Sequence, residues 1–261
     1  MRNELTLPKL SVITIVKDDP DGLAKTLESI VSQTDLLWEA VIVLSGKNDS
    51  SAQIASKYGD RFEQIKTVVQ SDTGIYQAMS LGWESAKGEF IWFMNAGDRF
   101  IEPNVASFAV TTMEEMKCEI LIGGYVLDTK PEKIFQFSES RISALHFSLN
   151  IRSGSHQAIC IRNSGDFQRQ FDARYKLAAD FKFILNRIRV GGGYRVSRAF
   201  ALVEPGGRSD TGIDLVLREK QEIRGDFFGK NSIGYYSGLI WTLGVKSKIK
   251  ARGIKNKLLR A

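Results

Sequence analysis

The sequence predicts an α/β protein with a mainly parallel central sheet flanked by helices. Two observations support this. Along the first hundred residues, short apolar, β-branched runs alternate with segments whose apolar residues keep helical spacing. One such run, Phe90–Met94, is apolar throughout, as expected for a parallel strand buried on both faces. The order β-α-β-α-β-α-β then implies right-handed crossovers and a ligand site at the carboxyl edge of the sheet.

The first strand is expected over Leu10–Val16, which is nearly all apolar and rich in β-branched residues. Asp19 and Pro20 follow it, and these are a favoured N-cap and a favoured first helical residue. The next expected elements are a strand over 38–44, a helix over 52–58 and a strand over 65–69.

The stretch from Ser71 to Asp98 combines a helix, a strand and a terminal acid. Apolar and small residues recur at helical spacing from Ile75 to Ala86, and Gly88 is expected to end that helix as a C-terminal glycine. Asp98 follows the buried strand, where an open parallel sheet binds its ligand. An ordinary polar turn after a strand explains Ala-Gly-Asp equally well.

The second half is less regular. We expect a strand over 119–127 with an antiparallel partner near 133–137, and a further strand ending near 161. A helix beginning at Ala178 is expected to stop at the glycines 191–193, and a strand over 199–203 leads into a loop.

Composition bounds the class of protein. The chain has 261 residues, 43% hydrophobic and 25% charged, which is typical of a soluble globular domain. Its two cysteines have no metal or redox spacing, and neither a signal peptide nor a membrane-spanning stretch is expected. The protein is therefore expected to be cytoplasmic.

The net charge of +6 comes from the residues after Asp226. Eight of the 36 Lys and Arg residues follow Asp226 and no acidic residue does, so the other 28 face 30 acids. This distribution argues against a nucleic-acid-binding body. Residues 233–245 mix apolar and aromatic side chains ahead of the basic run, a composition typical of interfacial membrane segments. The alternative is a helix docked on the protein with a solvated charged face.

Four stretches, in this order, carry a family resemblance: Ser11–Ile15, Asp72–Met79 (DTGIYQAM), Phe93–Asp98 (FMNAGD), and Ser155–Ala158 (SHQA) with Ala179–Phe181. The chain resembles family 2 glycosyltransferases of the GT-A fold, in the branch that builds bacterial colanic acid, capsule and O-antigen sugars. The GIYxAM segment before a strand ending in NAGD is its most specific part.

The resemblance implies an inverting enzyme that uses a nucleotide-diphosphate sugar. Asp180 matches the catalytic base, which takes the proton of the acceptor hydroxyl; an N-cap aspartate is the alternative. Asp98 matches the metal ligand of a DxD-type motif, holding Mg²⁺ or Mn²⁺ against the two phosphates. Asn95 and Gly97 stand where acids often occur, which puts strict metal dependence in doubt.

Further residues are expected to bind the nucleotide sugar by similarity: Thr14, Ile15, Val16, Asp72, Asn95, Ala96, His156 and Arg208. Core packing, surface turns and a strand-edge histidine are the structural alternatives for these positions. A UDP-sugar is favoured as the donor. A GDP-sugar is the alternative, because Leu44 and Ser45 stand where an acid reads uracil in many relatives.

The resemblance also implies a saccharide acceptor, carried on a polyprenyl lipid. Residues 1–225 would form the catalytic domain, divided near residue 100 into nucleotide-sugar and acceptor halves. Residues 226–261 would form a basic amphipathic tail that binds the anionic inner face of the plasma membrane.

Two other functions compete with transfer. A nucleotidyltransferase needs a glycine-rich, basic phosphate loop after the first strand, and Lys17-Asp18-Asp19-Pro20 is not one. A catalytically inactive homologue, acting as a nucleotide-binding subunit of a synthase complex, is compatible with the missing acids of the metal motif.

Overall fold

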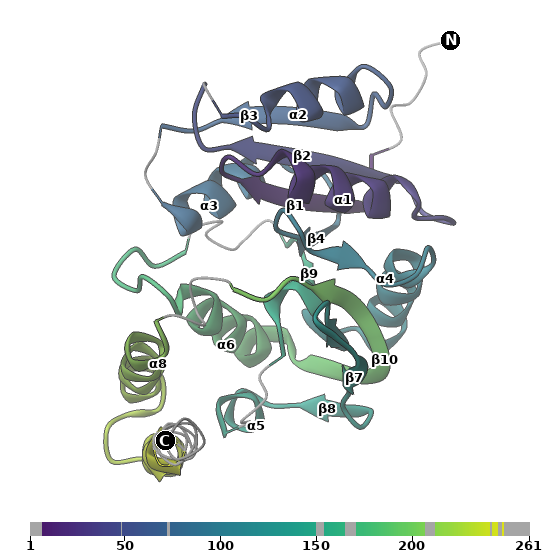
Figure 1. Cartoon of the computed structure of the whole chain (residues 1–261). Coiled ribbons are helices and arrows are strands. Elements are labelled where there is room, and N and C mark those ends of the chain that lie inside the picture. Colours follow the sequence, from purple (N-terminus) through teal and green to yellow (C-terminus); the bar gives the residue numbers. More distant parts are fainter. Residues whose placement is uncertain are drawn as a thin grey trace, which may run out of the picture.

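The computed structural model describes residues 7–47, 49–71, 74–149, 154–164, 171–206, 212–240, 242–244 and 247. Within them, ten strands form one sheet with the order β3-β2-β1-β4-β9-β6-β10-β5, while β7 pairs with β6 and β8 with β10. The strands β1, β2 and β3 with helices α1 and α2 occupy the upper half of Figure 1, and β10, α6 and α8 the lower half.

The first half is the expected parallel unit. Strands β2 and β4 flank β1, β3 flanks β2, and all three pairings are parallel. Its elements are β1 (Leu10–Val16), α1 (Pro20–Val31), β2 (Trp38–Leu44), α2 (Ala52–Gly59), β3 (Ile65–Val69), α3 (Ile75–Ser85) and β4 (Phe90–Phe93). Asp19 caps α1 as predicted, because its carboxylate accepts a hydrogen bond from the Gly22 amide at 2.9 Å.

The second half makes the sheet mixed rather than mainly parallel. Strand β9 runs antiparallel to both β4 and β6, and only β6 and β10 are parallel neighbours there. The elements are β5 (Arg99–Phe100), α4 (Val105–Met116), β6 (Ile120–Leu127), β7 (Lys130–Phe135), β8 (Ser140–Ile142), α5 (Ala144–Leu149), η1 (His156–Ala158), β9 (Ile159–Arg162), α6 (Ala179–Gly191), β10 (Gly193–Val203) and α8 (Ile213–Phe228).

Most expectations for this half are confirmed, and β10 is longer than the sequence indicated. Strand β7 is the antiparallel partner of β6, and Gly192 ends α6 with a φ of 77°. Strand β10 begins at Gly193, well before the expected residue 199, because its first part pairs with β6 and β8.

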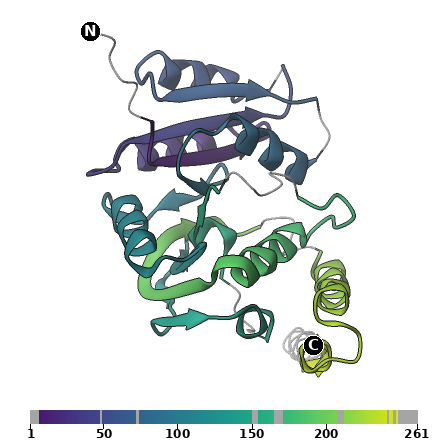
Figure 2. The same ribbon diagram turned by 180° about the vertical axis from the view of Figure 1, so that it is seen from behind.

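Two apolar layers cover the two faces of the sheet. Buried residues of α1, α2 and α4 pack with Leu10, Val12 and Val16 on one face. Buried residues of α3, α5, α6 and α8 pack with Ile13 on the other. Side chains alternate across a strand, so β1 contributes to both layers. Figure 2 shows the molecule from behind, with α8 in the lower half and β3 in the upper half.

The expectation that Gly88 ends α3 is wrong. The helix ends at Ser85, and Ala86 is already extended. Gly88 lies instead where the chain passes β1, and a Cβ there would stand 2.5 Å from the Ser11 backbone nitrogen. The glycine is needed for this close approach and not for a left-handed cap.

A buried carboxylate, that of Glu39, lies beside Ser11 and the segment that contains Gly88. Glu39 is 8% exposed, and it accepts hydrogen bonds from Ser11 Oγ, the Lys87 amide and Lys66 Nζ. The Ser11 hydroxyl in turn accepts from the Gly88 amide at 2.7 Å. Burial opposes ionisation of Glu39, but the ion pair with Lys66 and the hydrogen bonds outweigh it and lower the pKa.

We expect Glu39→Gln to lower the free energy of unfolding by about 1 to 3 kcal/mol at pH 7, because it removes charge-assisted hydrogen bonds from a buried cluster. Since the pKa of Glu39 is depressed in the folded state, its contribution is present above the unfolded value of 4.5 and fades as the pH falls below it. Urea unfolding at several pH values measures this. The exposed Glu63→Gln is the control, and equal losses in both variants at pH 7 would contradict the assignment.

Candidate active site

Antiparallel pairing of β4 with β9 brings two polar segments together. Trp92 pairs with Cys160, so the residues after β4 lie opposite those before β9. The Trp92 indole Nε1 also donates to the Gln157 carbonyl at 2.7 Å. The loop Asn95–Asp98 therefore meets η1 at the carboxyl end of β4, the edge where the sequence predicted a site.

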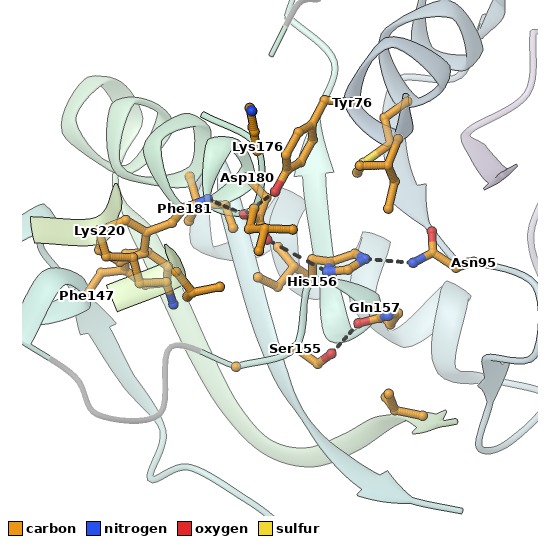
Figure 3. A pocket seen from close by; sticks show the side chains of 18 of the residues that line it. Tyr76, Asn95, Phe147, Ser155, His156, Gln157, Lys176, Asp180, Phe181 and Lys220 are labelled. Atoms are coloured by element: carbon orange, nitrogen blue, oxygen red, sulfur yellow. Dashed lines mark hydrogen bonds and ion pairs between the residues drawn. The ribbon is translucent and has the colours of Figure 1, made fainter. Parts of the chain in front are cut away.

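A cavity of about 270 Å³ opens at this edge. Its walls come from the first turns of α3 and α6, from η1, from the end of β10 and from α8 (Figure 3). The polar side chains that line it are Tyr76, Asn95, Ser155, His156, Gln157, Lys176, Asp180, Glu204 and Lys220. Of the predicted site residues, it brings together Asn95, His156 and Asp180.

Asp180 is the second residue of α6 and not its cap, since the N-cap is Ala178. Its Oδ1 accepts from the Tyr76 hydroxyl at 3.1 Å and from the Phe181 amide at 2.8 Å. A carboxylate in the first turn of a helix also faces the positive end of the helix dipole. Burial, reinforced by the charge of Asp180, raises the pKa of Tyr76, so the phenol stays protonated and donates a hydrogen bond to the carboxylate.

His156 lies between Asn95 and Asp180. Its Nε2 is 3.0 Å from Asn95 Nδ2, and its Nδ1 is 3.8 Å from Asp180 Oδ2. Figure 3 shows this row of side chains, with Tyr76 on the far side of Asp180. Burial lowers the pKa of His156, and the negative charge of Asp180 opposes that shift. Burial therefore favours the neutral imidazole.

Asp98 is 3% exposed and does not line the cavity. Its Oδ2 accepts from Gln157 Nε2 at 2.8 Å, and its Oδ1 accepts from the Glu204 amide at 2.9 Å. Burial raises the pKa of Asp98 to about 7 despite these hydrogen bonds, and the nearby Glu204 carboxylate adds to the rise. The residue joins the β4 loop to η1 and to the end of β10.

Asp98 and Glu204 are two carboxylates that could contribute ligands to a divalent cation. Each Asp98 oxygen accepts one hydrogen bond and keeps a further lone pair. Glu204 adds a second carboxylate: a Cβ on Gly97, whose φ is 93°, would stand 2.0 Å from Glu204 Oε2. Within the described ranges no group of three or more His, Cys, Asp or Glu side chains could hold a metal. Mg²⁺ and Mn²⁺ need few protein ligands when phosphates and water supply the rest.

The other predicted binding residues lie at the end of β1, in the loop after β4 (Ala96) or outside the described residues. Thr14 is fully buried in the sheet, and the carbonyls of Ile15 and Val16 accept from the Ala96 and Ser45 amides, both at 3.2 Å. None of these side chains lines the cavity, so a role in nucleotide binding would use backbone groups and stays a prediction. Asp72 and Arg208 lie outside the described residues.

Sequence reasoning missed several residues of the cavity. Tyr76 stands inside the GIYxAM segment and Gln157 inside the His-Gln pair, so both motifs contained the signal. Glu204 directly follows β10, and the rule that singled out Asp98 after β4 would have found it. Lys176 and Lys220 carry no such signal, because only the packing of α8 against α6 brings Lys220 to the cavity.

The arrangement suits proton removal from a bound hydroxyl. A carboxylate lies at the cavity wall with one oxygen held by two donors, which fixes the direction in which the other points. A general base of this kind needs only reach and orientation toward the hydroxyl it deprotonates.

Comparison with known proteins places the chain in a family. The profile of glycosyl transferase family 2 matches residues 11–170. A PGL/p-HBAD biosynthesis glycosyltransferase of Mycobacterium bovis is 27% identical over 183 residues, covering 69% of this chain and 69% of that protein. Glycosyltransferase GlyA of Streptococcus pneumoniae is 27% identical over 129 residues, covering 49% of this chain and 18% of GlyA. The chain thus spans less than half the length of several relatives that it matches.

Solved structures share the fold. Residues 1–349 of Staphylococcus aureus TarS superpose with a TM-score of 0.69 at 17% identity, covering 90% of this chain and 70% of that one. The TarS complex with UDP-GlcNAc gives 0.66 at 16% identity, covering 84% and 67%. The mannosyltransferase PcManGT of Pyrobaculum calidifontis, in complex with GDP-Man and Mn²⁺, gives 0.59 at 10% identity, covering 96% and 81%.

Proposed function

The chain belongs to glycosyl transferase family 2 and shares its fold with TarS; from that premise we propose that it is a glycosyltransferase that transfers a sugar, with inversion, from a nucleotide-diphosphate donor to a saccharide acceptor. One observation carries the proposal: the Asp180 carboxylate at the cavity wall, oriented by Tyr76 and the Phe181 amide. No covalent intermediate is needed, and no further nucleophile is assigned.

In the proposed step the acceptor hydroxyl attacks the anomeric carbon of the donor sugar. The bond between that carbon and the diphosphate oxygen breaks as the new glycosidic bond forms, and Asp180 takes the hydroxyl proton. Asp98, with Glu204 beside it, would hold a divalent cation, which when bound neutralises charge on the departing diphosphate. Asn95 and His156 lie between the Asp98–Glu204 pair and Asp180.

The donor proposal favours a UDP-sugar, with a GDP-sugar as the alternative. Support comes from the structural neighbours, since TarS was solved with UDP-GlcNAc and PcManGT with GDP-Man and Mn²⁺. For the acceptor we propose a lipid-linked saccharide of surface-polysaccharide biosynthesis. The proposed halves of the catalytic domain fit the parallel and mixed parts of the sheet, although α8 (Ile213–Phe228) continues past the proposed boundary at residue 225.

We also propose that the C-terminal region lies on an anionic membrane surface. Residues 233–240 are helical, and Ile233, Tyr236 and Ile240 are 80%, 51% and 71% exposed. Their spacing places them on one helical face, which is apolar and faces solvent. Most of the basic tail lies outside the described residues. No helix in the described part of the chain is long and apolar enough to cross a bilayer.

Asp180→Asn should reduce transfer by roughly 10²- to 10⁴-fold while leaving the urea unfolding curve unchanged, because it removes the base but keeps the shape of the side chain. Release of nucleoside diphosphate from UDP-glucose, UDP-GlcNAc and GDP-mannose in the presence of Mn²⁺ measures it. The exposed Asp60→Asn is the control. Full turnover by Asp180→Asn would refute the role, and no turnover by the wild type would favour the inactive nucleotide-binding homologue.

A thermal-shift panel of UDP and GDP, with and without Mn²⁺, should raise the melting temperature most for UDP with Mn²⁺, because a ligand that binds only the native state stabilises it. Asp98→Asn should remove the Mn²⁺-dependent part of the shift and keep the nucleotide part. A Mn²⁺ effect that survives this substitution would exclude Asp98 as the ligand.

The membrane proposal predicts that the protein floats with vesicles containing anionic phosphatidylglycerol and less with neutral vesicles, since each basic residue near an anionic surface gains roughly 1 kcal/mol. Ile233→Glu with Ile240→Glu should abolish flotation. The matched control is Val190→Glu on α6, which is 63% exposed and lies outside the C-terminal helix. Equal flotation of both variants would contradict the assignment.

A further inference from the structure

We propose that Asn95 and His156 act together as a positioning pair for Asp180: the Asn95 amide selects the His156 tautomer whose Nδ1–H points at the Asp180 carboxylate. The inference rests on the proposed role of Asp180 as the base. It assigns to Asn95 and His156 a role in orienting that base, where the sequence indicated contact with the donor.

The tautomer follows from the chemistry of the two contacting atoms. Asn95 Nδ2, 3.0 Å from His156 Nε2, belongs to an amide NH₂ group and can only donate. His156 Nε2 must then be the unprotonated, accepting nitrogen. A neutral imidazole carries one proton, which is left on Nδ1.

The proton on Nδ1 faces the base. Asp180 Oδ2 is 3.8 Å from that nitrogen, beyond a direct hydrogen bond but close enough for attraction between an N–H dipole and a carboxylate. The opposite tautomer would turn a nitrogen lone pair toward the same oxygen and repel it. The Asn95 side chain thus influences Asp180 without touching it.

The two carboxylate oxygens are consequently held from different sides. Oδ1 accepts from the Tyr76 hydroxyl and the Phe181 amide, and Oδ2 faces His156. The supports come from α3, α6 and η1, so the direction of the carboxylate depends on three separate elements. The positions of Tyr76 and Asp180, 104 residues apart, show that this is a tertiary construction.

Burial supports the same assignment. His156 is 26% exposed at the side chain, and burial lowers the pKa of its imidazole. A neutral ring carries one proton and so adopts one tautomer, and the polar group in contact with its Nε2 is the Asn95 amide.

The tautomer can be read directly in the substrate-free protein by ¹⁵N NMR of the imidazole nitrogens. The chain has only two histidines, so His146→Gln assigns the spectrum. We expect a protonated Nδ1 and an unprotonated Nε2 for His156. In Asn95→Asp the carboxylate should accept from Nε2, so that Nε2 becomes protonated. Protonated Nε2 in the wild type would overturn the proposal, as would a spectrum unchanged by Asn95→Asp.

Two substitutions of His156 separate a positioning role from a structural one. In His156→Asn the amide nitrogen of the new side chain would occupy about the place of Nδ1 and still donate toward Asp180. In His156→Gln the longer side chain would carry its amide nitrogen to about the place of Nε2 instead. We therefore expect His156→Gln to lower kcat roughly 10- to 100-fold at unchanged donor KM, since misorientation of a reacting group costs this much. His156→Asn should retain most of the activity.

Activity is measured as release of nucleoside diphosphate from whichever of UDP-glucose, UDP-GlcNAc and GDP-mannose the wild type turns over fastest. Equal kcat values in His156→Asn and His156→Gln, with matching melting temperatures, would overturn the positioning role. If the wild type turns over none of the three, it is the proposed function that fails. The NMR measurement needs no turnover and still decides whether Asn95 selects the tautomer.

Discussion

The site depends on the antiparallel pairing of β4 with β9. That register sets Trp92 opposite Cys160 and so carries the loop after β4 to the segment before β9. The hydrogen bond from the Trp92 indole to the Gln157 carbonyl secures the junction from inside the core. A shift of one residue would turn every side chain of the shifted strand to the other face of the sheet and separate Asn95 from His156.

Asp98 links three parts of the chain at that junction. It accepts from Gln157 of η1 and from the Glu204 amide after β10, and its own carbonyl accepts from Thr26 of α1 at 2.8 Å. Burial of the carboxylate next to Glu204 raises its pKa, so the folded protein holds an electrostatic cost at this point. A bound cation would offset that cost, which connects the packing of the loop with the chemistry proposed for it.

The wall of the cavity that holds Asp180 is built differently, because the first turns of two helices form it. Tyr76 comes from α3 and Asp180 from α6, and both helices pack on the same face of the sheet. Tyr76 and Asp180 therefore belong to one layer of helices. His156 lies between Asp180 and Asn95. This arrangement of the cavity is consistent with membership of glycosyl transferase family 2 and with the fold shared with TarS and PcManGT.

The sequence by itself determined the parallel half of the sheet, the cap of α1 and the family. Strands β1, β2 and β3 match the expected bounds because continuous apolar runs and local caps report on neighbouring residues. Motif order also singled out Asn95, His156 and Asp180, which the cavity brings together.

Only the tertiary structure decided the mixed second half, the role of Gly88, the burial of Asp98 and the contacts of Asp180. Each of these depends on partners far apart in the chain: Gly88 with Ser11, Asp98 with Glu204, Tyr76 with Asp180. Periodicity and propensity carry no information about such pairs, because their contacts exist only once the sheet has set its register.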